Sequence, residues 1–394
     1  MSSQRLRVLS VAHSAHGNGS SRLRYHALAK DESIELQLVV PARWKETGRT
    51  TRADPPDAAM DLRAHPVSLP WVMGAKWYLH WYPGLGKLIR SFEPDVIHLW
   101  EEPWAVVSLQ AAFLRDRIAP QAALILETEQ NILRKLPLPF ERIRRYTLQQ
   151  ADWLVARNAE SIEVSRACGY GGGATIVEYC VDTSRFHPSS EILPDRGTNA
   201  ATPLQLGYVG RIIREKGLFT VLEAMRQATG DITFTMMGDG ADRTDLMAAA
   251  NEMGLKDRVR FLPPGSGPQV AQFMATLDAL VLMSQTTRTW KEQFGRVIIE
   301  AQACGVPVIG STSGNIPFVV GEGGWVVQEG SATDLARLFN ELTADRSRAR
   351  NARPAAMRNV QRFTESVISS ALLTAWREAA EARRPQNAPL VCTA

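Results

Sequence analysis

Two groups of charged residues beside glycines have the composition of a phosphate-binding site. In the first, residues 207–217, a glycine turn is followed by Arg211, Arg214 and Lys216. A glycine lets the backbone approach a ligand closely, and the N-terminus of a following helix favours an anion. Because charge-assisted hydrogen bonds are strong, these Arg and Lys side chains suit a diphosphate. A solvated basic loop between a strand and a helix is the alternative interpretation.

The second group is a pair of glutamates within residues 292–310. Gly295 is expected to open a helix, so that Glu292 lies just before the helix and Glu300 lies within it. A carboxylate accepts up to about four hydrogen bonds, and two carboxylates so placed could hold two sugar rings that flank a phosphate. The alternative is a pair of surface glutamates. It fits Glu300 poorly, because an acid among apolar neighbours needs a polar partner.

The second half of the chain alternates short apolar runs with helical patterns. Continuous apolar strands that alternate with helices indicate a parallel sheet covered on both faces. We therefore expect a Rossmann-like α/β domain over residues 200–363. The predicted strands are 204–209, 233–237, 258–262, 279–283 and 306–310, and the predicted helices are 218–227, 243–253 and 295–303.

The first half repeats this pattern, which predicts a second Rossmann-like domain over residues 1–185. The expected strands are 7–12, 34–40, 95–100, 123–126 and 151–155, with a helix over 20–30. Residues 183–203 are rich in Pro, Ser, Thr and Gly and form the best linker candidate. We expect two domains that face each other across a cleft, with a final helix over about 364–383 that packs back on the first domain.

Bulk composition describes an ordinary globular chain of two-domain length. Of 394 residues, 45% are hydrophobic and 22% charged, and the formal net charge of +4 gives no argument for nucleic-acid binding. Four scattered cysteines show no metal-ligand spacing and are expected to be reduced thiols. The N-terminus lacks the apolar core of a signal peptide, and we expect a cytoplasmic protein.

Several motifs, in order and at matching spacing over nearly all of residues 204–340, resemble those of retaining glycosyltransferases of family 4. Enzymes of this family have the GT-B fold. The motifs are Gly-Tyr-Val-Gly-Arg and Glu-Lys-Gly within 207–217, Met237-Gly-Asp-Gly240, Asp257-Arg-Val-Arg-Phe261, the pair Glu292 and Glu300, Cys304-Gly-Val-Pro-Val308 and Ser313-Gly-Asn-Ile-Pro317.

The resemblance implies roles for residues of the first motif and of the glutamate pair. Arg211 and Lys216 would hold the donor diphosphate and stabilise the leaving group. Glu300 would bind the ribose hydroxyls, and Glu292 would orient the transferred sugar. These are the residues for which the resemblance implies chemistry.

Backbone groups complete the implied donor site. The N–H groups of Phe294 and Gly295 would assist Glu292, and Gly210 would let the chain approach the donor closely. Residues 262–268 match the loop that lies near the nucleobase in such enzymes.

The implied reaction moves a sugar from a nucleoside-diphosphate sugar, with a UDP- or GDP-sugar favoured, to a glycan, lipid-linked or small-molecule acceptor in polysaccharide biosynthesis. It is usually drawn as front-face attack, in which a donor phosphate oxygen takes the acceptor proton. This chemistry needs positioning and electrostatic stabilisation but no metal and no cofactor besides the co-substrate. The alternatives are a nucleotide-sugar epimerase of the same fold and a non-catalytic nucleotide-sugar-binding protein.

The first half matches the family more loosely. Gly17 and Gly19 fall where the family has a glycine-rich loop near the diphosphate. His98 is a candidate cleft residue, although a buried structural histidine is an equally good interpretation.

Three further residues of the first half are candidates for contact with the acceptor. Glu101 and Glu102 follow a strand and either meet the acceptor or are solvated loop acids. Gln130 stands near the position of a common family histidine and can hydrogen-bond a sugar but cannot act as an acid or base. The common Asn-Gly-Val-Asp is Tyr179-Cys-Val-Asp182 here.

Residues 71–92 and 133–145 mix aromatic or aliphatic side chains with Lys and Arg. Interfacial helices have this composition, and so do loops that pack on a core. We favour core packing. The other interpretation predicts peripheral contact with the inner face of a membrane and a lipid-linked acceptor.

Overall fold

The computed structural model describes residues 5–17, 20–46, 49–54, 63–69, 76–188 and 202–384. Its chain divides into two compact units, Met1–Glu178 together with Ile368–Ala394, and Tyr179–Val367. The first unit thus ends a few residues before the expected boundary at 185. Most of the expected linker, residues 189–201, lies outside the described residues.

The first unit is built on a parallel sheet whose strand order is β5-β2-β1-β6-β7-β8-β9. Its central strands are almost entirely buried, because a sheet covered on both faces must be apolar on both. The strands are β1 (Leu6–Val11), β2 (Ile34–Pro41), β5 (Arg63–Val67), β6 (Val96–Leu99), β7 (Ala123–Thr128), β8 (Trp153–Ala156) and β9 (Gly173–Ile176). A separate antiparallel hairpin joins β3 (Arg43–Glu46) to β4 (Arg49–Arg52).

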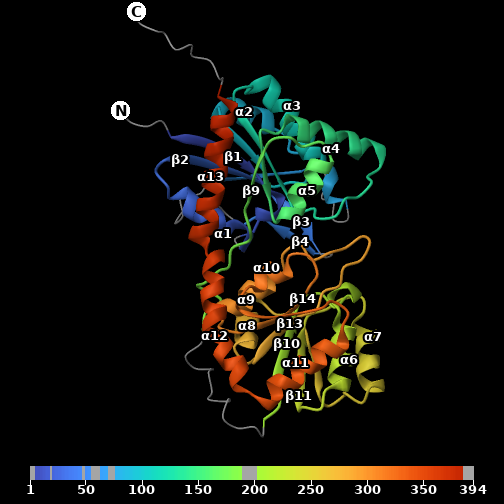
Figure 1. Ribbon diagram of the computed structural model, residues 1–394. Coiled ribbons are helices and arrows are strands. Elements are labelled where there is room, and N and C mark those ends of the chain that lie inside the picture. The colour runs from blue at the N-terminus through green and yellow to red at the C-terminus, as the bar shows by residue number, and fades with distance from the viewer. Residues whose placement is uncertain are drawn as a thin grey trace, which may run out of the picture. The chain divides into compact units, whose positions relative to one another are not determined.

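Helices cover this sheet, and α2, α3 and α4 lie side by side (Figure 1). The helices are α1 (Ser20–Ala29), α2 (Leu85–Phe92), α3 (Val106–Ile118), α4 (Leu138–Gln150), α5 (Ala159–Ala167) and α13 (Glu365–Arg383). From residue 368 on, α13 belongs to the first unit. Ser369 Oγ donates to the carbonyl oxygen of Arg24 in α1, and the Trp376 ring lies 5.7 Å from that of His98 in β6.

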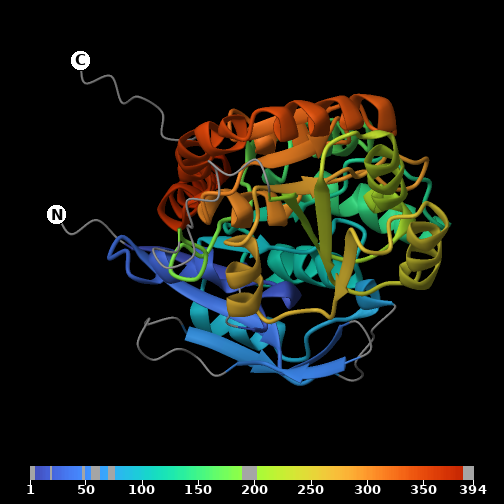
Figure 2. The ribbon, with the colours of Figure 1, turned by 90° about the horizontal axis from the view of Figure 1, so that it is seen from below.

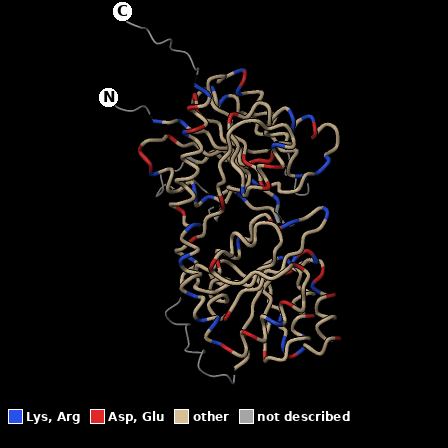
Figure 3. Tube along the Cα trace, viewed as in Figure 1, with Lys and Arg blue, Asp and Glu red and all other residues tan. Residues whose placement is uncertain are grey.

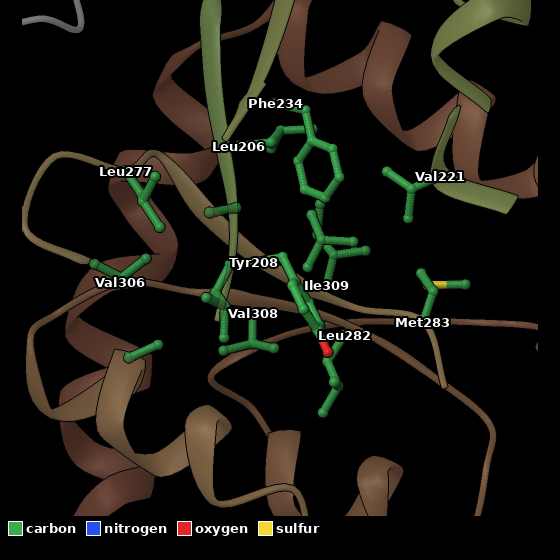
Figure 4. Close-up of a cluster of buried hydrophobic side chains, with 14 of the residues drawn as sticks. Leu206, Tyr208, Val221, Phe234, Leu277, Leu282, Met283, Val306, Val308 and Ile309 are labelled. Atoms are coloured by element: carbon green, nitrogen blue, oxygen red, sulfur yellow. The ribbon is translucent and has the colours of Figure 1, made fainter. Parts of the chain in front are cut away.

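The second unit contains a parallel sheet of order β12-β11-β10-β13-β14-β15. The order reverses direction at β10, and this switch point is where ligands bind in open α/β sheets. Figure 4 shows part of its core, in which Tyr208, Phe234 and Ile309 pack together. The strands are β10 (Leu204–Val209), β11 (Ile232–Met237), β12 (Val259–Leu262), β13 (Ala279–Leu282), β14 (Val308–Ser311) and β15 (Gly324–Val327).

Two helical layers enclose the second sheet. In one layer α6 contacts both α7 and α11, and α8, α9, α10 and α12 form the other layer. Helices α11 and α12 follow each other along one edge of this unit in Figure 2. The helices are α6 (Leu218–Gln227), α7 (Arg243–Glu252), α8 (Gly267–Met274), α9 (Arg296–Ala303), α10 (Ile316–Val320), α11 (Ala332–Ala344) and α12 (Ser347–Asn359).

The prediction of a Rossmann-like α/β fold in both halves is confirmed. Both signs of charge are distributed over each unit (Figure 3). Among the helices that the structure describes, none has both the length and the apolar composition needed to cross a bilayer.

Candidate active site

A pocket of about 470 Å³ opens in the second unit where β10 and β13 end and α9 begins. This volume is in the range of small-molecule and cofactor sites. The sequence-predicted residues that line it are Gly210, Arg211, Lys216, Glu292, Phe294, Gly295 and Glu300. The fold therefore brings together the residues predicted from the two charged motifs except Arg214, which does not line the pocket.

The loop after β10 carries the two cations into the pocket. It ends at Gly217, whose φ of +66° is left-handed and which stands at the N-terminus of α6. A Cβ atom there would lie 1.8 Å from the carbonyl oxygen of Met283, so only glycine fits. The hydroxyl of Tyr208 donates to the carbonyl oxygen of Arg211 at 2.6 Å and holds the start of the loop.

Lys216 and Glu292 form the central ion pair of the pocket. The Lys216 Nζ donates to Glu292 Oε2 at 2.6 Å, and the Ser284 hydroxyl donates to the same oxygen at 2.7 Å. Both side chains of the ion pair are largely buried, with 14% and 10% exposed. A charge-assisted bond in such surroundings fixes the positions of both partners.

The N-terminus of α9 supplies backbone donors between the two glutamates. Gly295 caps the helix with a φ of +82°, so the helix begins at Arg296, one residue later than predicted. The main chain of Glu292 is held in turn, because the N–H of Asn315 donates to its carbonyl oxygen at 3.2 Å. The free N–H groups and dipole at a helix N-terminus favour an anion.

Glu300 lies in the second turn of α9. Burial raises the pKa of its carboxyl above the ordinary value, while Arg296 and Arg185 act in the opposite direction. No hydrogen bond to the Glu300 carboxylate is found among the described residues. A half-buried carboxylate of this kind is suited to accept hydrogen bonds from a ligand.

Tyr179, Gln293 and Arg296 also line the pocket and were missed as site residues. The Arg296 guanidinium lies 5.4 Å from the centre of the Tyr179 ring, which also contacts Phe294 edge to face. In the sequence, Tyr179 was noted only as a departure from a family motif. Its role as a pocket residue was missed because nothing in the local sequence places it beside α9. In addition, Gly267 and Pro268, predicted to lie in a loop, belong to α8.

In the first unit His98 is a buried structural residue. Its Nδ1 lies 3.0 Å from Ser10 Oγ and its Nε2 lies 3.0 Å from Glu127 Oε2. Glu127 is also paired with Arg24 and Arg157. Although burial acts to raise the pKa of Glu127, the two guanidinium groups lower it well below its usual range. His98 is therefore part of a closed ionic network.

Of the two glutamates after β6, Glu101 is buried and Glu102 is half-buried, and both accept hydrogen bonds from the protein, so neither is a solvated loop acid. Glu101 accepts from His13, and Glu102 accepts from the Thr128 hydroxyl and the Glu129 N–H. Burial acts to raise the pKa of Glu101, but His13 and His80 lower it to about 2. Burial raises the pKa of Glu102 to about 7.

The remaining candidates of the first unit have local roles in the structure. The Gln130 side chain donates to the carbonyl oxygen of Ile132 at 3.0 Å. Gly17 lies in the turn that follows β1, and Gly19 lies outside the described residues.

The stretches 71–92 and 133–145 differ in the burial of their apolar side chains. In the described part of 71–92, Tyr82, Leu85, Ile89 and Phe92 are buried, in agreement with core packing. In 133–145, Leu133 and Leu138 are 59% and 63% exposed. Exposed leucines occur singly on many surfaces and do not define a membrane contact.

Two parallel α/β units, one with a cationic pocket at its switch point, are the arrangement expected of the GT-B fold. The family model described as "Glycosyl transferases group 1" matches residues 190–359. The lipopolysaccharide core biosynthesis glycosyltransferase LpsE of Rhizobium meliloti is 32% identical over 73% of this chain and 76% of its own length. A D-inositol 3-phosphate glycosyltransferase of Mycobacteroides abscessus is 30% identical over 83% of this chain and 71% of its own length. The chain belongs to this glycosyltransferase family, family 4, and is a glycosyltransferase.

Solved structures of other proteins have the same fold as this chain. The sucrose-phosphate synthase of Thermosynechococcus elongatus superposes with a TM-score of 0.74 at 20% identity, over 96% of this chain and 100% of that one. Anabaena Alr3699/HepE in complex with UDP and glucose superposes with a TM-score of 0.68 at 20% identity, over 94% of this chain and 99% of that one. Family membership favours a transferase over the epimerase and over a non-catalytic binding protein.

Proposed function

We propose that this enzyme transfers a sugar from a nucleoside-diphosphate sugar with retention of configuration and without a metal ion at the donor. The observation that supports this proposal best is the pocket of the second unit. It combines three cationic side chains, a helix N-terminus and two carboxylates, which suit the phosphates and hydroxyls of a nucleotide sugar.

Each part of the donor has a matching group in the pocket. Arg211 and Lys216 bind the diphosphate, with the backbone N–H groups at the start of α9. Glu300 accepts hydrogen bonds from the ribose, because its half-buried carboxylate lines the pocket and has no hydrogen-bond donor among the described residues. Glu292 accepts them from the transferred sugar while Lys216 and Ser284 keep its carboxylate in place.

The catalytic contribution follows from the charge that develops in the reaction. As the glycosidic bond breaks, negative charge grows on the diphosphate, and Lys216 and Arg211 stabilise it. A donor phosphate oxygen takes the proton of the acceptor hydroxyl, which attacks from the same face as the departing diphosphate. The protein therefore supplies position and charge rather than a nucleophile.

Similar proteins suggest the substrate classes. The superposable Anabaena protein was solved with UDP and glucose, and relatives are named for transfer to inositol 3-phosphate or for lipopolysaccharide core synthesis. We therefore propose a UDP- or GDP-sugar as donor and a hydroxyl of a glycan, a lipid-linked glycan or a small polyol as acceptor.

Independence from metal at the donor is supported by the partners of Glu292. Its carboxylate is already neutralised by Lys216. Lys216 and Arg211 supply the positive charge that a metal ion would otherwise supply at the diphosphate. Positive side chains thus perform the charge neutralisation that a magnesium ion performs in other phosphate sites.

The stereochemical part of the proposal is tested by slow hydrolysis of the donor. UDP-glucose and GDP-mannose, both α-linked, are incubated with the enzyme, and the released sugar is followed by proton NMR before its anomers equilibrate. We expect the α anomer to appear first. If the β anomer is the first product, the retaining mechanism is wrong.

A further inference from the structure

Three potential metal ligands converge in the first unit, and none of them lines the donor pocket. His13 lies in the turn after β1, His80 lies before α2, and Glu101 follows β6. One ligand atom of each lies within 4.8 Å of the others, and this is the one such group of three among the residues that the structure describes. Three separate segments of the chain thus meet at one point.

The hydrogen bonds of His80 leave one ring nitrogen aimed into this group. Its Nδ1 lies 2.5 Å from the carbonyl oxygen of Trp77, which can only accept, so Nδ1 carries the proton. Burial acts to lower the pKa of His80 but the Glu101 carboxylate raises it, so a metal ion at Nε2 would take the place of a proton on that atom. That atom is buried and has no hydrogen-bond partner, and it lies 3.5 Å from Glu101 Oε1. A carbonyl oxygen that fixes the ring in this way is typical of metal-binding histidines.

Glu101 and His13 complete the group. Glu101 is buried, and its Oε2 lies 2.6 Å from His13 Nδ1, while its Oε1 accepts the backbone N–H of His13 at 2.8 Å. The His13 side chain remains 22% exposed, which gives an ion a path to the group. His80 Nε2 and Glu101 Oε1 are 3.5 Å apart, which is too far for a good hydrogen bond, whereas a metal ion between the two atoms would bind both.

Aromatic rings surround the ligands. The rings of Trp44 and Trp77 lie 4.9 and 5.2 Å from that of His13, and the Tyr82 ring lies 5.4 Å from that of His80. An apolar shell limits access of water and strengthens the attraction between a cation and a carboxylate.

We propose that His13, His80 and Glu101 bind one divalent transition-metal ion, with zinc as the best fit, through two imidazole nitrogens and a carboxylate oxygen. Imidazole and carboxylate suit zinc, and a tetrahedral ion at about 2.0–2.1 Å separates its ligand atoms by roughly 3.3 Å. The site goes beyond the proposed function. It ties the turn after β1 to the loop after β6.

Metal binding is tested directly on the full chain, purified without a histidine tag and stripped with EDTA. Zinc chloride is titrated into the protein by calorimetry, and cobalt(II) is added separately to record its visible absorption. We expect one ion per chain and a cobalt spectrum of four-coordinate type. His13→Ala and His80→Ala should each weaken zinc binding at least roughly 100-fold, whereas His187→Ala, an exposed histidine of the second unit, should leave it unchanged.

Two results would overturn the site: no saturable zinc binding by the unaltered chain, or equal binding by the His13→Ala and His80→Ala variants. Circular dichroism checks that each variant is folded, and His13→Ala is the safer variant because its side chain is partly exposed. The measurement does not depend on turnover, so its failure would leave the donor proposal standing.

Discussion

Lys216 has two proposed roles. It neutralises the Glu292 carboxylate, and it lines the pocket where the donor diphosphate is proposed to bind. Replacement by alanine should remove charge-assisted contacts worth roughly 1.5–3 kcal/mol, or about 10- to 150-fold in turnover. The rate of nucleoside-diphosphate release from the donor measures this loss.

Arg214 is the matched control for Lys216. It lies in the same loop but is 70% exposed, pairs with Asp242 and does not line the pocket. Arg214→Ala should keep turnover within about twofold, since exposed ion pairs contribute little. If a folded Lys216→Ala variant works as well as the unaltered enzyme, Lys216 does not contact the diphosphate.

Glu102 is expected to make the first unit less stable as the pH rises. Burial raises its pKa from 4.5 to about 7, so between these values the folded state binds more protons than the unfolded state. Stability therefore falls with rising pH in that window, by up to about 3 kcal/mol in total. Glu102→Gln should flatten this dependence, as measured by hydrogen exchange of β6 and β7 from pH 4.5 to 8. An unchanged slope in the variant would show that Glu102 is not the titrating group.

At the scale of elements, the turn between β10 and α6 depends on Gly217. Alanine in the left-handed conformation costs about 1–2 kcal/mol, and here its Cβ would also collide with the Met283 carbonyl oxygen. Gly217→Ala should therefore destabilise the second unit by at least about 2 kcal/mol in urea unfolding and should weaken donor binding. Gly254→Ala is the control, because its φ is also positive but no atom lies within 4 Å of the added carbon. Equal losses in both variants would mean that backbone strain, not the collision, matters.

Several elements of the second unit were predicted closely from its sequence, whereas β15, α8, α10, α11 and α12 were not predicted. Residues 204–209 and 218–227 were predicted to the residue, because each apolar run ends at a glycine or a polar turn. Helix α12 was missed since it is rich in arginine and contains Pro354, so no apolar stripe marks it. In the first unit, strand β9 was also missed, because it follows a run of glycines, which indicates a loop rather than a strand.

The donor pocket could be predicted where its residues share one local motif, as Glu292 and Glu300 do. The group formed by His13 and Glu101 could not, because the two residues are 88 positions apart and only the pairing of β1 with β6 brings them together. His80 precedes a helix and carries no motif at all. Contacts of this kind arise from topology, which short-range patterns do not contain.

At the scale of the molecule, the last helix stabilises the unit that contains the first residues of the chain. Trp376 of α13 is fully buried, and its loss should leave a large cavity. Trp376→Ala should destabilise the first unit by about 3–5 kcal/mol and leave the second unit unchanged. Hydrogen exchange should show lost protection in β1 and β6 and normal protection in β10 and β13. Thr374→Ala, on the exposed side of the same helix, should have little effect. A uniform loss over both units would contradict this assignment.

The central claim is that the pocket of the second unit binds and activates a nucleotide sugar without a metal. The most direct measurement incubates UDP-, GDP-, ADP- and dTDP-sugars with the purified enzyme in EDTA and follows release of the nucleoside diphosphate. We predict that a UDP- or GDP-sugar is consumed, by hydrolysis or transfer, and that Lys216→Ala abolishes most of this activity. If no donor is consumed and none raises the melting temperature, the pocket is not the donor site and the account is wrong.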